Sequence, residues 1–386
     1  MKKYLLSFAV LVMGMSLMTA CSDDDETPYE PQEVEVSNGV FVVCSGNMST
    51  PINGGLTYFD YATSTATPQA FKAVNGRELG LTVNDALVYG DKMYIVVDNE
   101  NTIEVVNKKD MTSVKQIKLK DMMADGQGAH PRHIIAQDGN IYVSNYGTSN
   151  ADWASYTITG NGSVAVIDAE TYQLKATYAV GGYPEGLAIV GNDLYVVNSN
   201  YSMGNASISK INLSTGAETK ISHADIINPV AAVAINGNLY YLDSGAYGAT
   251  PPYAQENAGV RKVTADGQVT KVVDATAMCS DGKKIYVINS PYGVGSTSYA
   301  IYDVASNTTK AFTPSEDVEY PNTIGIDPVN GNIFIASNSK DADTGKASYK
   351  TPGYVKQYKA DGTFVSKFNC WVGPCAIIAN TAVEYK

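Results

Sequence analysis

The chain has 386 residues, a formal net charge of −12 and 10% aromatic residues. No basic patch recurs along it, so the composition argues against a partner nucleic acid. Beyond the N-terminal segment no apolar run is long enough to span a membrane. Roughly 350 residues remain for folded structure, which is long for one ordinary domain but suits a closed repeat architecture.

The N-terminus carries an export signal. Lys2 and Lys3 precede an apolar run from Leu5 to Met18, which is too short for a transmembrane helix and typical of a signal-peptide core. The run ends in "MTAC", which resembles a bacterial lipobox. We therefore expect residues 1–20 to be a lipoprotein signal peptide and Cys21 to carry the lipid that holds the protein on a membrane. Ordinary cleavage after an A-x-A-like site is the alternative.

An acidic segment, "SDDDE", follows Cys21 directly. It resembles the surface-export signal of Bacteroidetes lipoproteins, which implies a lipid-anchored position on the cell-surface face of the outer membrane. The alternative is a solvated acidic linker. Residues 21–36 are too poor in apolar side chains to form a core, so we expect them to be a tether before a folded domain at 37–386.

One phrase recurs in the folded part. "YPEGLAIVGNDLYVVNSN" (183–200) returns as "HPRHIIAQDGNIYVSNYG" (130–147) and "NPVAAVAINGNLYYLDSG" (228–245). Each copy has two short β-rich runs joined by a hairpin turn, and two more strands follow before the next copy. Four strands per unit with a period near 45 residues predict the blade of a β-propeller.

The copies predict how many blades there are. They begin 45 to 53 residues apart, at Asn84, Pro131, Pro184, Pro229, Thr276, Pro321 and Pro374. The seventh first strand has no second strand after it, whereas "GVFVVCSGN" (39–47) is a second strand without a first. We therefore predict an all-β, seven-bladed β-propeller whose N- and C-terminal strands share one blade, which removes open sheet edges. A β-sandwich pair would not explain the period, and a solenoid would not need complementary ends.

The long loops are expected on one face. The turns between first and second strands are tight, whereas the loops after the second strands are long, and in a propeller all of these loops emerge on the same side. We expect their aromatic residues to form a ligand platform: Tyr146, Trp153, Tyr156, Tyr201, Tyr247, Tyr253, Tyr292 and Tyr349. The alternative is that these rings pack the loops onto the blades.

Polar residues are expected near the propeller axis, where the first strands begin. The predicted set is Asp85, Arg132, Glu185 and Asn322. Arg132 suits bidentate recognition of a phosphate or carboxylate, or would pair with Glu185 on the next blade. Some propellers bind a central metal through Glu, Asp and Asn and hydrolyse lactones, and Asp85, Glu185 and Asn322 would imitate that set.

Catalytic motifs are otherwise missing. The sequence has no H-E-x-x-H, P-loop, nucleophile elbow or zinc-type cysteine spacing. His130 and His133 lie three apart on an extended segment and would point to opposite faces. We therefore predict no catalytic residue, no resident metal and no cofactor.

Four cysteines follow Cys21, and an exported protein permits disulfides. Alignment of the blades places Cys375 at the start of a first strand and Cys44 at the end of the adjacent second strand. A Cys44–Cys375 bridge would pin the ring closure, and Cys370–Cys375 is the competing pair. Cys279 is expected to be a small buried hydrophobe.

The lipobox, the acidic segment and the "P-x-x-h-x-h-x-x-G-N-x-h-Y-V-x-N" repeats resemble YncE-like propellers over essentially the whole chain. Among them the chain is most similar to BtuG-like surface lipoproteins of gut Bacteroidetes. The resemblance implies a non-enzymatic protein that captures cobalamin or another corrinoid, as a transported ligand, and passes it to a BtuB-type TonB-dependent outer-membrane transporter that it caps. A glycan-binding or scaffold propeller and a metal-dependent lactonase-like enzyme are the alternatives.

Overall fold

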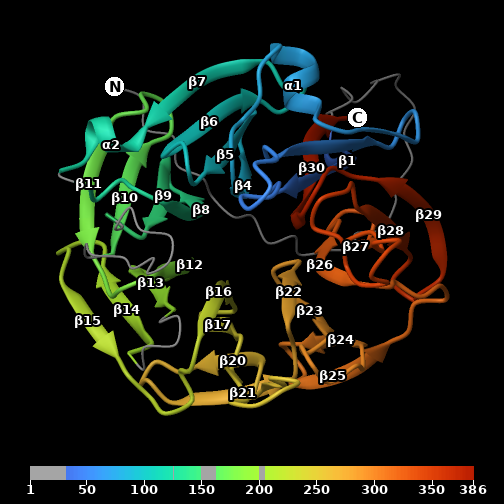
Figure 1. The fold of residues 1–386 in the computed structure, drawn as a ribbon. Helices are drawn as coiled ribbons and strands as arrows, with labels where there is room; N and C mark the ends of the chain where they lie inside the picture. The colour runs from blue at the N-terminus through green and yellow to red at the C-terminus, as the bar shows by residue number, and fades with distance from the viewer. Residues whose placement is uncertain (1–31, 125, 149–161, 200–204) are drawn as a thin grey trace, which may run out of the picture.

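Seven four-stranded antiparallel sheets stand around a central axis, as predicted from the repeats (Figure 1). The computed structural model describes residues 32–386 except 125, 149–161 and 200–204. The signal peptide, Cys21 and nearly all of the expected tether therefore lie outside the described residues.

Six blades are each built from one continuous part of the chain, with the first strand innermost. In chain order their strands are β4 (Val83–Tyr89), β5 (Lys92–Val97), β6 (Thr102–Asn107) and β7 (Ser113–Lys118); β8 (Pro131–Gln137), β9 (Asn140–Asn145), β10 (Ser163–Asp168) and β11 (Leu174–Ala179); β12 (Pro184–Val190), β13 (Asp193–Asn198), β14 (Ser207–Asn212) and β15 (Glu218–Ile221); β16 (Pro229–Ile235), β17 (Asn238–Asp243), β20 (Gly259–Val263) and β21 (Val269–Val273); β22 (Ala277–Ser280), β23 (Lys284–Asn289), β24 (Ser298–Asp303) and β25 (Thr308–Phe312); β26 (Pro321–Ile326), β27 (Ile333–Ser337), β28 (Tyr354–Tyr358) and β29 (Phe364–Asn369).

Small elements decorate these blades. A two-stranded hairpin, β18 (Ala246–Tyr247) and β19 (Gln255–Glu256), is inserted between β17 and β20. The helices of the described residues are short, α1 (Ala70–Asn75) with 6 residues and α2 (Leu119–Met122) with 4. Among the described residues no helix has the length and apolar character needed to cross a bilayer.

The seventh blade closes the ring with both ends of the chain. Its strand order is β3 (Thr65–Thr67), β2 (Gly55–Asp60), β1 (Glu33–Cys44) and β30 (Pro374–Tyr385). Phe41 of β1 pairs with Ile378 of β30, so the C-terminal strand is the innermost strand of a blade that the N-terminus begins. The predicted sharing of one blade is confirmed. β1 starts at Glu33, earlier than the expected domain start at 37, because its first residues pair with the end of β30.

Buried side chains form one apolar cluster at each of the seven junctions between neighbouring blades. At the junction between the β12–β15 and β16–β21 blades, Val197 and Ile208 pack in the same cluster as Tyr241. Each sheet contributes to the clusters on both of its sides, which explains why the second strands are buried along nearly their whole length. The ring is therefore one continuous packed structure.

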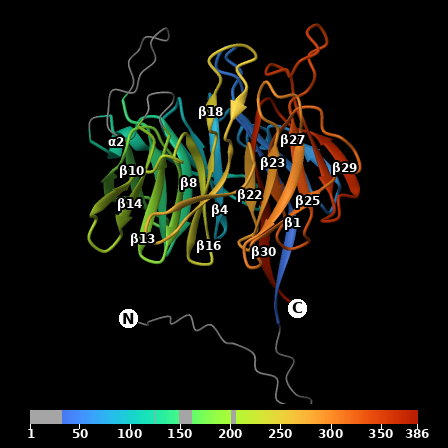
Figure 2. The ribbon, with the colours of Figure 1, turned by 90° about the horizontal axis from the view of Figure 1, so that it is seen from below.

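The two faces of the ring differ. Figure 2 shows the described long loops after the second strands, among them the β18–β19 hairpin and the loop between β27 and β28, rising on one side, which we call the loop face. On the opposite side the ends of β1 and β30 extend beyond the sheets as a ribbon, in which Glu33 pairs with Tyr385 (Figure 2). We call residues 33–37 and 381–385 the stem. The N-terminal segment therefore joins the domain on the side away from the loop face.

The expected Cys44–Cys375 bridge is wrong, because the two side chains lie in the apolar clusters on opposite sides of the closing blade. Cys44 pairs with Pro374 and Val43 with Ala376, so Cys375 is an unpaired bulge residue between them. The bulge turns the Cys375 thiol toward the backbone carbonyls of Val43 and Val83, on the opposite side of the blade from Cys44. The competing Cys370–Cys375 pair is separated in the same way, because Cys370 lies in the cluster that contains Cys44.

Candidate functional site

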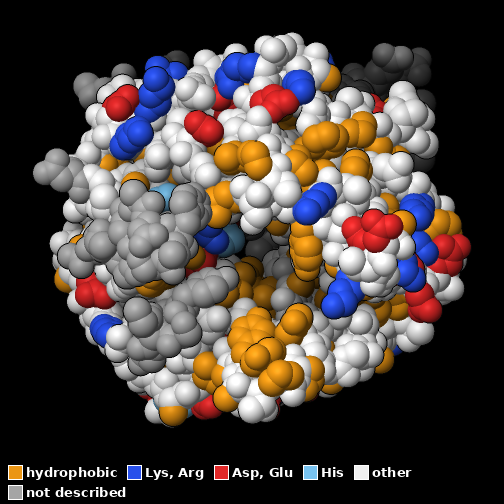
Figure 3. All heavy atoms as spheres, viewed as in Figure 1, with side chains coloured by type: hydrophobic (Ala, Val, Ile, Leu, Met, Phe, Trp, Pro, Cys, Tyr) orange, Lys and Arg blue, Asp and Glu red, His pale blue; other side chains and the backbone are white. Residues whose placement is uncertain are grey.

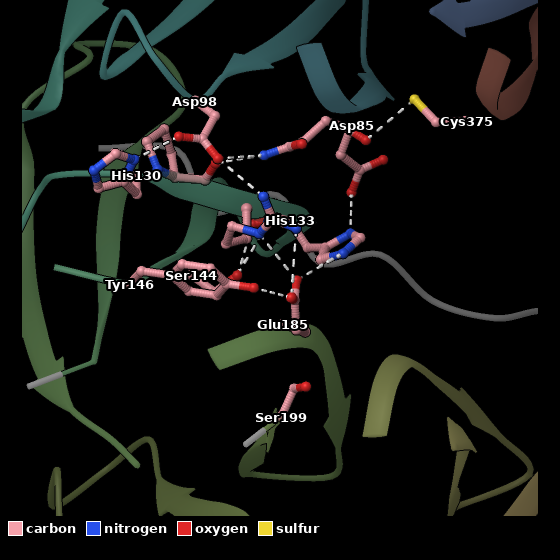
Figure 4. A network of polar contacts seen from close by, with 12 residues as sticks. Asp85, Asp98, His130, His133, Ser144, Tyr146, Glu185, Ser199 and Cys375 are labelled. Atoms are coloured by element: carbon pink, nitrogen blue, oxygen red, sulfur yellow. Dashed lines mark hydrogen bonds and ion pairs between the residues drawn. The ribbon is translucent and has the colours of Figure 1, made fainter. Parts of the chain in front are cut away.

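The first strands bring a charged cluster together at the channel end that opens on the loop face. β4, β8 and β12 are neighbouring inner strands, and close to their starts they carry Asp85, Arg132 with His133, and Glu185 (Figure 4). β8 and β12 begin with equivalent prolines, Pro131 and Pro184. The residues that follow these prolines therefore occupy equivalent places beside the channel. Three of the four predicted axial residues are therefore brought together.

Arg132 connects three blades. Its Nη1 donates to Oδ2 of Asp98 at 2.9 Å, and its Nε donates to Oε2 of Glu185 at 3.1 Å. Its guanidinium lies 4.6 Å from the ring centroid of Tyr146, whose hydroxyl also donates to Glu185. The pairing with Glu185 is confirmed, and Arg132 is held in place by groups of the protein itself.

His133 lies between two carboxylates. Its Nδ1 is 3.1 Å from Oδ2 of Asp85 and its Nε2 is 3.4 Å from Oε2 of Glu185. Burial disfavours the imidazolium, but these two acids outweigh it and raise the pKa of His133 from 6.5 to about 9. Burial likewise opposes ionisation of Glu185, yet Arg132 and His133 lower the pKa of Glu185 from 4.5 to about 2. At neutral pH the cluster is a set of fixed charges in which each cation, Arg132 or His133, contacts two carboxylates.

Asp98 and His130 extend the cluster. Nδ1 of His130 lies 2.7 Å from Oδ1 of Asp98, a buried side chain that follows β5 directly. Although burial opposes ionisation, His130 and Arg132 lower the pKa of Asp98. Sequence reasoning did not select Asp98. The sequence feature that could have indicated Asp98 is its position directly after a second strand, the position that Tyr146 occupies in the next blade.

Asn322 does not join this cluster. Its amide donates to the carbonyl of Pro374 on the next inner strand, just as the amide of Asn84 donates to the carbonyl of Pro131 at 3.0 Å. Asn322 therefore ties neighbouring blades together and does not join Asp85 and Glu185 in the set that would imitate a metal-binding propeller. In the described part of the chain, no three His, Cys, Asp or Glu side chains are grouped so that they could hold a metal ion.

Three of the predicted aromatic residues form a patch on the loop face. Tyr247, Tyr253 and Tyr292 are 55%, 48% and 62% exposed, and the rings of Tyr247 and Tyr292 are 6.4 Å apart in an edge-to-face arrangement. The backbone N–H of Gln255 donates to the carbonyl of Tyr292 at 2.8 Å, which joins the hairpin to the loop of the next blade. We call Tyr247, Tyr253 and Tyr292 the tyrosine patch.

The other predicted aromatics do not form one ring with this patch. Tyr146 is buried in the charged cluster. Tyr349 is 60% exposed on a separate loop, where its carbonyl accepts from the amide of Asn47 at 2.6 Å. Trp153, Tyr156 and Tyr201 lie outside the described residues. The described residues therefore do not form a continuous ring of aromatic side chains.

Figure 3 shows the loop face, with a hollow at its centre and cationic and histidine side chains beside it. Hydrophobic side chains gather beside the hollow over the β16–β21 blade, where the tyrosine patch lies (Figures 1 and 3). The face thus places an exposed apolar surface next to a polar opening.

A second concave region lies beside the closing blade. Two clefts of ≈ 560 Å³ and ≈ 390 Å³ share Asn53 and Glu78 in their linings. The larger is lined mostly by charged and polar side chains, and the smaller contains Trp371, whose Nε1 donates to the carbonyl of Asn53 at 2.9 Å.

Comparisons with known proteins show the fold alone. No protein-family model matches the chain, and no curated protein matches it in sequence. A functionally unknown protein from Desulfotomaculum acetoxidans is 13% identical, with a TM-score of 0.57 over 89% of this chain and 99% of that one. Hydrazine synthase from Kuenenia stuttgartiensis is 14% identical, with a TM-score of 0.52 over 77% and 93%. An apocarotenoid oxygenase variant from Synechocystis is 11% identical, with a TM-score of 0.53 over 93% and 97%.

Proposed function

We propose that the protein is a lipid-anchored cell-surface protein that captures cobalamin or another corrinoid on its loop face and delivers it to a BtuB-type TonB-dependent outer-membrane transporter. The observation that carries the proposal is the tyrosine patch, which is exposed beside the central hollow on the face opposite the stem. A lipid on Cys21 would hold the stem side toward the membrane. The patch would then face the medium from which the ligand comes.

The chemistry of the patch suits a large amphipathic ligand. Phenol rings offer flat apolar surface with a polar edge, and a corrinoid has extended apolar faces fringed with amides. The ring of packed blades holds Tyr247 and Tyr292 in place before binding, which lowers the entropy lost on complex formation. Binding of this kind needs no catalytic group, so the proposal is for a capture protein and not an enzyme.

Calorimetric titration of the mature protein with cyanocobalamin tests the proposal. We expect a tight complex with one ligand per chain. Absence of binding at ligand concentrations of about 100 μM, well above those at which capture would operate, contradicts it.

Glycan binding is a second candidate, favoured by the paired clefts beside Trp371. An indole beside polar side chains is suited to a sugar ring, since one face of the ring is apolar and its edge carries hydroxyls. Retention on immobilised polysaccharide, with no response to cyanocobalamin, would select this candidate.

A further inference from the structure

The end of the closing blade brings two cysteines together that are far apart in sequence. Cys44 ends β1, and Cys370 follows β29 of the preceding blade. Both are fully buried, and both belong to the apolar cluster between these two blades. Cys44 lies on the same side of β1 as Val42, because side chains alternate along a strand.

Backbone contacts place Cys370 on that same side. The N–H of Trp371 donates to Oγ1 of Thr57 at 3.0 Å, and Thr57 is the residue of β2 paired with Val42. The N–H of Ser45 donates to the carbonyl of Gly373 at 2.8 Å, so the segment after Cys370 runs along the end of β1. Cys370 also lies close enough to Cys44 to raise the pKa of the Cys44 thiol.

We propose that Cys44 and Cys370 form a disulfide that locks the closed ring, whereas Cys279 and Cys375 stay as thiols. The oxidant is a disulfide, either a dithiol–disulfide oxidoreductase of the cell envelope or oxidised glutathione. The Sγ–Sγ bond forms as the oxidant's S–S bond breaks, and the two thiol protons pass to the two sulfurs of the reduced oxidant. The proposal rests on the export part of the proposed function only for its oxidising compartment.

Burial determines when the bond can form. It raises the pKa of the Cys44 thiol well above its usual range, with a further contribution from Cys370. The folded protein therefore holds little thiolate at this position, and disulfide exchange there is slow. The bond is expected to form while the ring is closing and to resist reductants afterwards.

A refolding experiment tests the Cys44–Cys370 pairing independently of where the protein is located in the cell. The reduced full chain is unfolded in denaturant and refolded in a buffer of oxidised and reduced glutathione. Free thiols are then alkylated under denaturing conditions and the peptides are mapped by mass spectrometry. We expect Cys44 and Cys370 to be recovered in one cross-linked peptide pair and Cys279 and Cys375 to be alkylated. Alkylated Cys44, or a bridge to Cys375, overturns the proposal.

Cysteine variants, and protein isolated from cell envelopes, complete the test. C375S should keep the cross-link, and C370S should leave Cys44 open to alkylation; the wild-type map stands even if C370S fails to fold. The oxidised protein should melt about 5 °C or more above the reduced one. If the bond forms in the glutathione buffer but not in protein taken from cell envelopes, the finding counts against export and not against the pairing.

Discussion

Nε2 of His133 lies 3.4 Å from Oε2 of Glu185, across the junction between the β8–β11 and β12–β15 blades. Glu185 also accepts from Arg132 and Tyr146, so one carboxylate with a side-chain exposure of 4% serves three partners. The charged cluster thus contributes to holding three blades around the channel. It also gives the loop face a rigid polar centre.

Replacing Glu185 by glutamine should destabilise the fold by about 3 kcal/mol. The substitution removes the buried carboxylate that Arg132 and His133 share, and leaves each of them only one acidic partner, Asp98 and Asp85 respectively. Denaturant unfolding measures the change. E319Q is the matched control, because the Glu319 side chain is 53% exposed and 3.9 Å from Lys340, and it should change the free energy of unfolding by no more than about 0.5 kcal/mol. Equal effects of the two variants would contradict a structural role for the cluster.

The stability of the protein should depend on pH at both ends of the range. The folded-state pKa of His133 is raised from 6.5 to about 9, so its contribution is complete below pH 6.5 and is lost as the pH rises to about 9. The pKa of Glu185 is lowered from 4.5 to about 2, so its contribution is complete above pH 4.5 and is lost as the pH falls toward 2.

The free energy of unfolding, measured against pH, should therefore be highest between about 4.5 and 6.5 for these two groups. H133Q should flatten the decline between pH 6.5 and 9, since the group that releases its proton is gone. An unchanged alkaline decline in H133Q would show that other groups cause it.

Loss of a ring from the tyrosine patch should weaken ligand binding. Y292A removes a side chain that is 62% exposed and that neighbours Tyr247, and we expect about a tenfold higher Kd for cyanocobalamin. Y385A is the control, because Tyr385 is 68% exposed on the stem, at the opposite side of the ring. Calorimetry compares the variants. Unaltered binding by both Y292A and Y247A would remove the patch from the site.

Gly186 should not tolerate a side chain. A Cβ there would lie 2.5 Å from the backbone nitrogen of Ala232, so β12 can approach β16 closely only with glycine at this position. G186A should cost about 2 kcal/mol of unfolding free energy, from overpacking between the two inner strands. Gly182, just before β12, provides the control, because a Cβ there would have no neighbour within 4 Å. If G182A destabilises as much as G186A, the close packing is not the cause.

Much of the fold follows from local patterns. The prolines at 131, 184, 229, 321 and 374 each begin a first strand, as the repeats predict. Two predicted starts are one residue off: β4 begins at Val83 and β22 at Ala277. Neither of these strands starts with proline, so the sequence marks the boundary less sharply.

The candidate site was less accessible to sequence reasoning. Asp85, Arg132 and Glu185 were selected correctly as axial, because they hold equivalent places in successive repeats. Asp98 was missed, since its role depends on reaching His130 and Arg132 of another blade. Asn322 was selected for the same reason as Arg132, yet its amide binds the backbone of the adjacent strand.

The sequence by itself determined the number of blades and their closure, because each repeat encodes its own strands and turns and the two ends are complementary halves of one blade. Only the tertiary structure decided which side chains meet. A one-residue bulge at Cys375 separates it from Cys44 and leaves Cys370 as the neighbour, and a bulge in the pairing of two distant strands has no local signature. The packing of the ring likewise decided that Tyr146 is buried and Tyr292 exposed, although both follow second strands.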